Sequence, residues 1–282
     1  MSALAPSSGS PVPSGGDGIT YRELERVHAP THEEFVRNYL RPRRPVVLTG
    51  VADGWHARHH WSLDYLAETF GDTPAIAAPL RNGTLADDSK RGVEFHHVKL
   101  REFIASLAQP GSADAYVMAP TWNFPERLQA EYETPSYAAG YPYMQAKVWV
   151  GKTGTVTPVH RDIPHNFHVH LTGRKRWLLF SPKESAHLYP RGMFSGLPNF
   201  AWADPGQPDY ERFPRLRGAQ GVACLCGPGD TLFIPSGWWH HTRLLDDCVS
   251  MNFWWGGRLV YAASRVSKLF KRIRNIQRGE WA

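Results

Sequence analysis

Two histidines and one aspartate carry the clearest chemical signal in the sequence. His160 and Asp162 are two residues apart, and side chains two apart on a β-strand point to the same side. His240 follows much later, directly after a pair of tryptophans. Two imidazoles and one carboxylate occupy one face of an octahedral metal and leave three positions open, which is the arrangement of non-haem Fe(II) sites. The sequence therefore predicts an iron site formed by His160, Asp162 and one imidazole from the pair His240 and His241.

A His-x-Asp pair alone is a weak signal, because the chain contains 14 histidines. The alternative interpretation is a histidine that is exposed or hydrogen-bonded in the core. The neighbouring sequence favours the metal interpretation. Asn166 follows Asp162 by four residues, Lys175 stands in the next apolar run, and Asn252 lies in the last one.

This ordered series of motifs resembles the JmjC/cupin-like hydroxylases, which are oxygenases that depend on Fe(II) and 2-oxoglutarate. The resemblance extends from about residue 20 to residue 255. It rests on the residues above and on the segments 43–50, 188–190, 208–214 and 227–235, with Trp55, Trp61 and Gly71. It implies Fe(II), 2-oxoglutarate and O2 as cofactor and cosubstrates, and it assigns His160, Asp162 and His240 to the iron. His241 would then point to the opposite face, where it would pack or support the site.

The resemblance also implies a binding site for 2-oxoglutarate. Lys175 would pair with the distal carboxylate of this cosubstrate, and the Thr157 hydroxyl would donate to the same group. A buried carboxylate is costly without a cation and hydrogen-bond donors, so these residue types suit the task. The predicted cosubstrate-binding residues are Lys175, Thr157, Asn166, Asn252 and Tyr116.

Some residues depart from the family pattern or match nothing in it. Relatives usually carry a hydrophobic residue and a glutamine where this chain has His168 and His170. These two are either polar core residues with local partners, contacts to cosubstrate or substrate, or a second metal site. Arg161 is expected to point away from the metal, toward the mouth, and Phe200 and Trp202 either contact substrate or pack structurally. The predicted substrate-contacting residues are Arg161, His165, His168, Trp202 and Trp239.

The implied reaction is hydroxylation of a protein or peptide side chain, with release of succinate and CO2. Hydroxylation is favoured over N-demethylation, because the match is to the smaller hydroxylases. A small metabolite or a modified tRNA base stays open as the substrate. The second function class is a metal-binding cupin that does not use 2-oxoglutarate, and the third is a non-catalytic binding module. Lys175, Thr157 and Asn252 argue against the second class, and the complete metal triad argues against the third.

Length and pattern indicate the fold that must position these residues. The 282 residues are 42% hydrophobic and 21% charged, enough for one large domain with a substantial core. Short apolar runs separated by Gly, Pro and Asp follow from residue 143, which is typical of a sandwich or barrel. With the resemblance, the predicted fold is mainly β: a jelly-roll (double-stranded β-helix) core, an N-terminal α/β extension and a C-terminal helix. The predicted divisions are a disordered leader (1–18), an oxygenase domain (19–257) and the helix (258–282).

The net charge of +6 is concentrated in residues 258–282. Apolar residues recur there at spacings of three and four, which predicts an amphipathic helix. We expect Leu259, Val266, Phe270 and Ile273 to be buried, in a homodimer or against the barrel. Nucleic acid or an anionic lipid surface is the alternative partner of the basic face. Three cysteines favour a reducing, cytoplasmic location, and the sequence contains no apolar run long enough to span a membrane.

Overall fold

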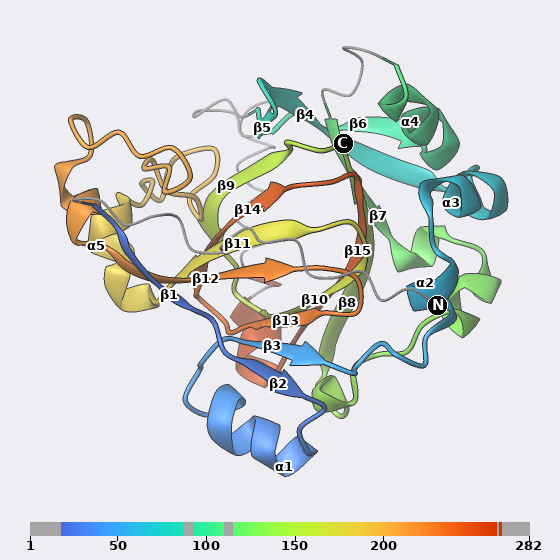
Figure 1. Cartoon of the computed structure of the whole chain (residues 1–282), viewed down its shortest axis with the longest axis horizontal. Helices are drawn as coiled ribbons and strands as arrows, with labels where there is room; N and C mark the ends of the chain where they lie inside the picture. The colour runs from blue at the N-terminus through green and yellow to red at the C-terminus, as the bar shows by residue number, and fades with distance from the viewer. Residues whose placement is uncertain (1–17, 87–92, 110–114, 264, 267–282) are drawn as a thin grey trace, which may run out of the picture.

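The computed structural model describes residues 18–86, 93–109, 115–263 and 265–266. The predicted leader lies outside the described residues apart from Gly18. Within these described ranges, fifteen strands form two facing sheets that curve into a barrel (Figure 1). The predicted mainly β jelly-roll core is confirmed.

The first sheet contains the two strands that carry the predicted histidine ligands His160 and His240. Its strands, in spatial order, are β1 (Thr20–Glu23), β12 (Gln220–Cys226), β11 (Lys175–Phe180), β14 (Trp239–Leu244), β9 (Val156–Arg161) and β5 (Thr84–Leu85). The pairs within it are antiparallel except β1–β12 and β5–β9. This sheet therefore places β9 and β14 side by side.

The second sheet faces the first across the core, and β4 pairs with strands of both. Its order is β4 (Pro74–Arg81), β7 (Ala115–Pro120), β8 (Tyr143–Gly151), β15 (Cys248–Gly256), β10 (His165–Thr172), β13 (Thr231–Ile234), β3 (Val46–Thr49) and β2 (Arg26–His28), with β6 (His96–Lys99) on β4. β10 and β15 are central strands, and most of their side chains are buried. A polar side chain on these strands therefore needs a partner inside the barrel.

Helices cover the outer edges of the barrel. They are α1 (His32–Phe35), continued by a π-helix (Val36–Leu40), α2 (His56–His60), α3 (Leu63–Phe70), α4 (Leu100–Leu107) and α5 (Ser185–Leu188), with short 3-10 turns at Thr121–Asn123, Glu126–Ala130, Ser136–Ala138, Pro182–Glu184 and Pro214–Gly218. The Thr31 hydroxyl accepts from Glu34 N and the Glu34 carboxylate accepts from Thr31 N, so a capping box starts α1. Phe35 of α1 packs on Phe167 and Phe233, which fixes this helix to the second sheet.

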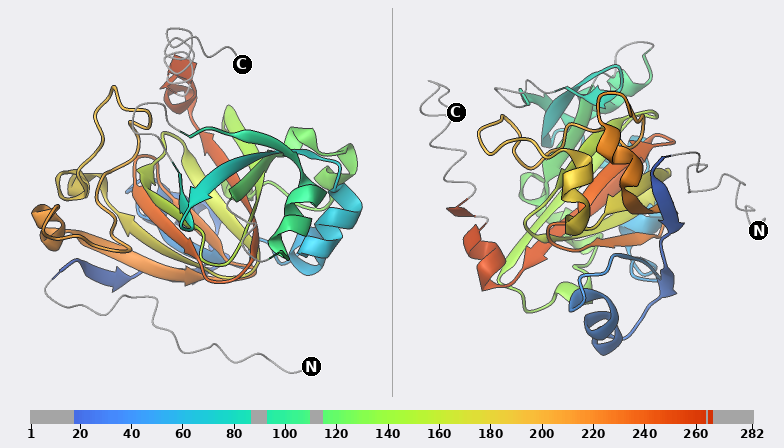
Figure 2. Two further views of the ribbon diagram at one scale, coloured as in Figure 1. Left: turned by 90° about the horizontal axis from the view of Figure 1, so that it is seen from above. Right: turned by 90° about the vertical axis from the view of Figure 1, so that its left-hand side faces the viewer.

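The C-terminal segment leaves the barrel after β15. Residues 258–263 are helical and project from the body of the molecule (Figure 2). Leu259 is 87% exposed and Val266 is 52% exposed, so the barrel does not bury this apolar face at these two positions. Phe270 and Ile273, which were also expected to be buried, lie outside the described residues. Within the described part of the chain, none of the helices has the length and apolar character needed to cross a membrane.

Candidate metal and cosubstrate site

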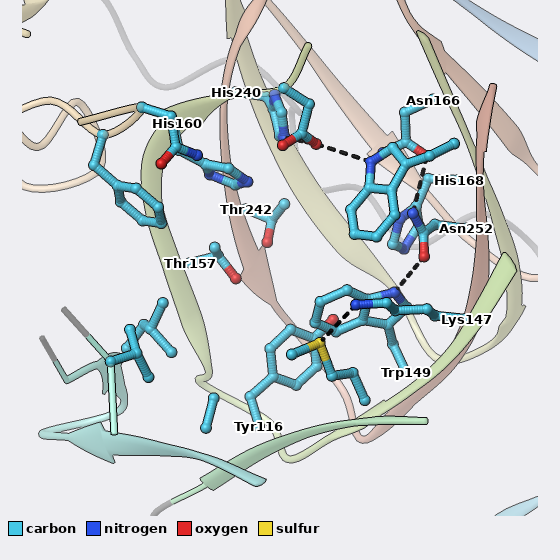
Figure 3. A pocket seen from close by; sticks show the side chains of 18 of the residues that line it. Tyr116, Lys147, Trp149, Thr157, His160, Asn166, His168, His240, Thr242 and Asn252 are labelled. Carbon is cyan, nitrogen blue, oxygen red and sulfur yellow. Dashed lines mark hydrogen bonds and ion pairs between the residues drawn. The ribbon is translucent and has the colours of Figure 1, made fainter. Parts of the chain in front are cut away.

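Strand pairing brings the two distant histidines together. β9 and β14 are antiparallel neighbours, and His160 lies directly opposite His240 in their register. The two imidazole centroids are 4.1 Å apart, and both rings face the same cavity (Figure 3). The register of this one strand pair therefore sets the distance between the two predicted ligands.

Asp162, the residue directly after β9, completes the cluster. Its backbone carbonyl accepts a hydrogen bond of 2.8 Å from Gly237 N, which ties this end of the strand to the turn before β14. One ligand atom from each of His160, Asp162 and His240 lies within 4.8 Å of the others, and His240 Nε2 is 3.8 Å from Asp162 Oδ2. His241 points away from the cluster and contacts Asp204 at 3.4 Å.

Hydrogen bonds to the far side of each ligand fix its orientation. Nδ1 of His160 lies 2.9 Å from the Pro158 carbonyl, and Nδ1 of His240 lies 3.1 Å from the Trp238 carbonyl. A carbonyl only accepts, so each Nδ1 carries a proton, and it is Nε2 that is directed to a metal. Burial lowers the pKa of His240 to about 3, so this ring stays neutral. The donor set fits Fe(II), which accepts two imidazoles and one carboxylate.

The cluster opens into a cavity of about 270 Å³ between the two sheets. Aromatic and apolar side chains form much of its wall. Polar side chains from several strands also line it, among them Tyr116, Thr157, Asn166, His168, Thr242 and Asn252 (Figure 3). A cavity with few convergent polar groups is typical of a small-molecule site.

Lys175 is a buried cation that contacts the wall of this cavity. It is 1% exposed, and its Nζ lies 2.6 Å from Ser250 Oγ, 3.1 Å from the Tyr116 hydroxyl and 3.1 Å from His168 Nε2. Among the described residues no carboxylate pairs with it. Burial lowers its pKa to about 8, because an unpaired ammonium is costly away from water. The site therefore lacks a negative charge that a bound carboxylate would supply.

The remaining cosubstrate candidates line the same cavity. Thr157 and Thr242 are partners across β9 and β14. The Asn252 side chain accepts from Trp149 Nε1 at 2.6 Å and donates to Asn166 Oδ1 at 3.4 Å. All five residues predicted for the cosubstrate thus meet in one place, four in the cavity wall and Lys175 in contact with that wall.

Four of the five predicted substrate contacts do not line the cavity; His168 does. Arg161 is exposed and lies over the Trp239 ring at 4.7 Å. Trp239 is fully buried on the outer face of β14, because it neighbours His240 and so points the other way. His165 stacks against Phe233, and Trp202 is 44% exposed beside Arg191.

The structure adds residues that the sequence interpretation missed. Ser250 contacts Lys175, and it stands two residues before Asn252 on β15, so the strand period was the available signal. Trp254 Nε1 donates to Asp162 Oδ2 at 3.0 Å and orients the carboxylate. Phe200, for which the sequence left substrate contact and structural packing open, stacks on the His160 imidazole at a centroid distance of 4.9 Å. No sequence spacing indicates that contact, since it comes from a loop excursion.

Comparison with known proteins agrees with the geometry. The profile of the Cupin-like domain family matches residues 31–258. The chain belongs to the JmjC/cupin-like oxygenase family. This confirms the predicted family, and the names of its members describe oxygenases, hydroxylases and demethylases.

Curated relatives of this JmjC/cupin-like chain carry several names. Lysine-specific demethylase 8 of Xenopus tropicalis is 32% identical over 238 residues, which is 82% of this chain and 52% of the relative. The human bifunctional peptidase and (3S)-lysyl hydroxylase JMJD7 is 27% identical over 80% of this chain and 81% of its own length. The 2-oxoglutarate and iron-dependent oxygenase JMJD4 of Gallus gallus is 28% identical, over 82% of this chain and 59% of its own length. The chain spans about half the length of the first of these relatives.

Proposed function

We propose that this protein hydroxylates a side chain of a protein or peptide, using Fe(II), 2-oxoglutarate and O2. One observation carries the proposal. The oriented cluster of His160, Asp162 and His240 lines a cavity whose wall also contacts the buried Lys175 ammonium. Among the described residues, this ammonium has no carboxylate partner. The names of the relatives support a protein substrate, since one is a lysyl hydroxylase and another a lysine-specific demethylase.

Two groups of residues have separate roles in metal binding and in cosubstrate binding. His160, Asp162 and His240 would hold the iron, and Lys175 with its neighbours would hold the distal carboxylate of the cosubstrate. When bound, iron and 2-oxoglutarate supply the oxidising chemistry, in which O2 provides one oxygen atom to succinate and one to the substrate. The aromatic wall, including Trp177 and Trp254, limits the access of water.

The test is release of succinate from 2-oxoglutarate by the Fe(II)-loaded protein, with and without cell extract proteins as substrate. We expect succinate release that rises with the protein fraction, and a mass increase of one oxygen atom on a peptide from it. The Asp162→Ala variant is the control and should release none. Stimulation only by a small-molecule or tRNA fraction would contradict the protein substrate. Absence of 2-oxoglutarate binding would contradict the oxygenase and favour a cupin of another class.

We also propose that the C-terminal helix forms a homodimer. The exposure of Leu259 and Val266 in the single chain supports this, because a second copy would cover apolar surface that the barrel leaves open. Light scattering should show a dimer for the full chain and a monomer or aggregate after truncation at Gly257. An unchanged oligomeric state in the truncated protein would contradict the proposal, and loss of salt-sensitive RNA or vesicle binding alone would favour a basic arm instead.

A further inference from the structure

Lys147 brings a second cation to the cavity. On β8, Val148 and Val150 are buried in the hydrophobic core, so by strand alternation Lys147 and Trp149 point to the opposite face, where both line the cavity. The Lys147 side chain is half-buried and extends from β8 into this space (Figure 3). The proposed function gives this residue no role in binding the metal or the cosubstrate.

The ammonium of Lys147 lies close to the metal cluster. Its Nζ is 5.0 Å from the centre of the Trp254 ring and 3.5 Å from Met118 Sδ. The Trp254 indole donates its N–H to Asp162 Oδ2 at 3.0 Å, so one side chain contacts both the ammonium and a predicted metal ligand. Lys147 and the metal cluster also line the same cavity. A substrate side chain that reaches the metal therefore passes near Lys147.

Few charged residues line this cavity. Among the described residues of its wall, Lys147 and Asp162 are the only members of the set Lys, Arg, Asp and Glu. Asp162 is a predicted metal ligand, and Lys175 contacts the wall without lining it. A substrate therefore meets the Lys147 cation and, in the described wall, no carboxylate besides that of the metal ligand.

The proposed occupants balance the other charges of the site. Fe(II) is a dication and 2-oxoglutarate a dianion, and the charges of Lys175 and Asp162 are opposite. The Lys147 ammonium stands outside this balance, in a space where contact with water is limited. Opposite charges attract more strongly there than in bulk water. A carboxylate is therefore the substrate group that this end of the cavity stabilises best.

A cationic substrate side chain is disfavoured by the same residue. The face of a tryptophan attracts ammonium and guanidinium groups, and Trp254 would otherwise suit a lysine or an arginine. Lys147 already lies over that ring. A second cation there would meet like-charge repulsion, by which binding sites commonly reject wrong partners.

We propose that Lys147 selects the substrate: the side chain that this protein hydroxylates is acidic, aspartate or glutamate, and its carboxylate pairs with the Lys147 ammonium. The inference rests on the proposed function and names its substrate class. It sets this chain apart from the relatives whose names specify lysine. A free carboxylic acid presents the same group, and oxidation of separate extract fractions distinguishes it from a protein.

The first test is binding of capped Gly-Xaa-Gly tripeptides to the protein loaded with Mn(II) and 2-oxoglutarate, without O2 so that no turnover occurs. Mn(II) broadens the proton resonances of a bound peptide, so an NMR titration measures affinity. We expect the Asp peptide to bind at least about threefold more tightly than the isosteric Asn peptide, since charge-assisted hydrogen bonds are the stronger ones. The Lys peptide should bind more weakly than both. Equal binding of the Asp and Asn peptides, or tighter binding of the Lys peptide, would overturn the inference.

Variants assign the preference to this residue. Lys147→Met keeps the length of the side chain without its charge and should bind the Asp and Asn peptides equally, whereas Lys147→Arg should retain the preference for Asp. Lys183→Met is the matched control, because it removes an exposed lysine that does not line the cavity. Titration with Mn(II) checks that each variant is folded. A preference for Asp that persists in Lys147→Met, or that is lost equally in Lys183→Met, would overturn the inference.

The second test locates the added oxygen atom. The Fe(II)-loaded protein is supplied with 2-oxoglutarate, isotopically labelled O2 and either the protein or the small-molecule fraction of a cell extract. Mass spectrometry should find the label on aspartate or glutamate residues of proteins. A label on lysine, arginine or a neutral residue would overturn the inference and leave the proposed function intact. A label confined to small molecules, or no label in either fraction, would overturn the proposed function on which the inference rests.

Discussion

The two ends of the cavity differ in whether their polar and charged groups already have partners in the free protein. At the metal end, the Nδ1 atoms of His160 and His240 are held by the backbone carbonyls of Pro158 and Trp238, and Trp254 holds the Asp162 carboxylate. At the other end, Lys175 carries a buried charge that only neutral groups contact among the described residues. The metal end is thus oriented before anything binds, while the Lys175 end is electrostatically incomplete until an anion arrives.

This difference shows where binding free energy is gained. The ligands need no rearrangement, so metal affinity depends on their number and on the groups that orient them. At Lys175 the cost of burying an unpaired ammonium is present in the free protein and is relieved by a carboxylate. Variants at the two ends should therefore separate metal binding from cosubstrate binding.

The largest effect is expected for Asp162→Ala. It removes the only carboxylate of the cluster and leaves two neutral imidazoles, so Mn(II) should bind at least about 100-fold more weakly, since even loss of an orienting partner costs 10- to 100-fold. Titration of Mn(II) followed by electron paramagnetic resonance measures this. Mn(II) binding close to wild type would show that another group supplies the ligand.

Lys175→Met should weaken the binding of 2-oxoglutarate and leave the binding of the metal nearly unchanged. We expect 2-oxoglutarate to bind at least about tenfold more weakly, because a charge-assisted hydrogen bond is lost, while Mn(II) affinity stays within about twofold. The free variant should be as stable as wild type or more so, since an unpaired buried charge is gone. Denaturant unfolding checks the second part, and a marked loss of stability would mean that Lys175 is not an uncompensated charge.

Trp254→Phe tests how the carboxylate is oriented. The variant keeps an aromatic ring but loses the indole N–H that donates to Asp162 Oδ2. Mn(II) should bind about tenfold more weakly, at the low end of the range for such partners. Trp149→Phe is the comparison, because this indole donates to Asn252 and not to a ligand. An equal loss of Mn(II) affinity in the two variants would contradict an orienting role that is specific to Trp254.

The pH dependence gives the most gradual effect. The pKa of Lys175 is lowered to about 8 by burial, so the ammonium is present below pH 8 and is lost as the pH rises above it. Affinity for 2-oxoglutarate should fall above pH 8, by up to about tenfold per pH unit, and binding at pH 9 should take up a proton. Calorimetry in buffers of different ionisation enthalpy measures that proton. Affinity that does not change up to pH 10 would contradict a lowered pKa.

Strand periodicity made part of the site predictable. His160 and Asp162 share a face because they are two residues apart, and the apolar runs that carry Lys175 and Asn252 became β11 and β15. The same period could have excluded Trp239, which precedes His240 by one residue and so lies on the other face. It could also have identified Ser250, two residues before Asn252.

The sequence by itself determined the residue types of the site, the family and the mainly β class. It gave His240 and His241 opposite faces, as on a strand, but it did not predict that β14 pairs with β9 and so places His240 opposite His160. It left the role of His168 open, since only the fold shows Lys175 Nζ 3.1 Å from its ring. Local spacing fixes which face of a strand a side chain takes, whereas register between distant strands and contacts inside a barrel arise only when the chain closes on itself.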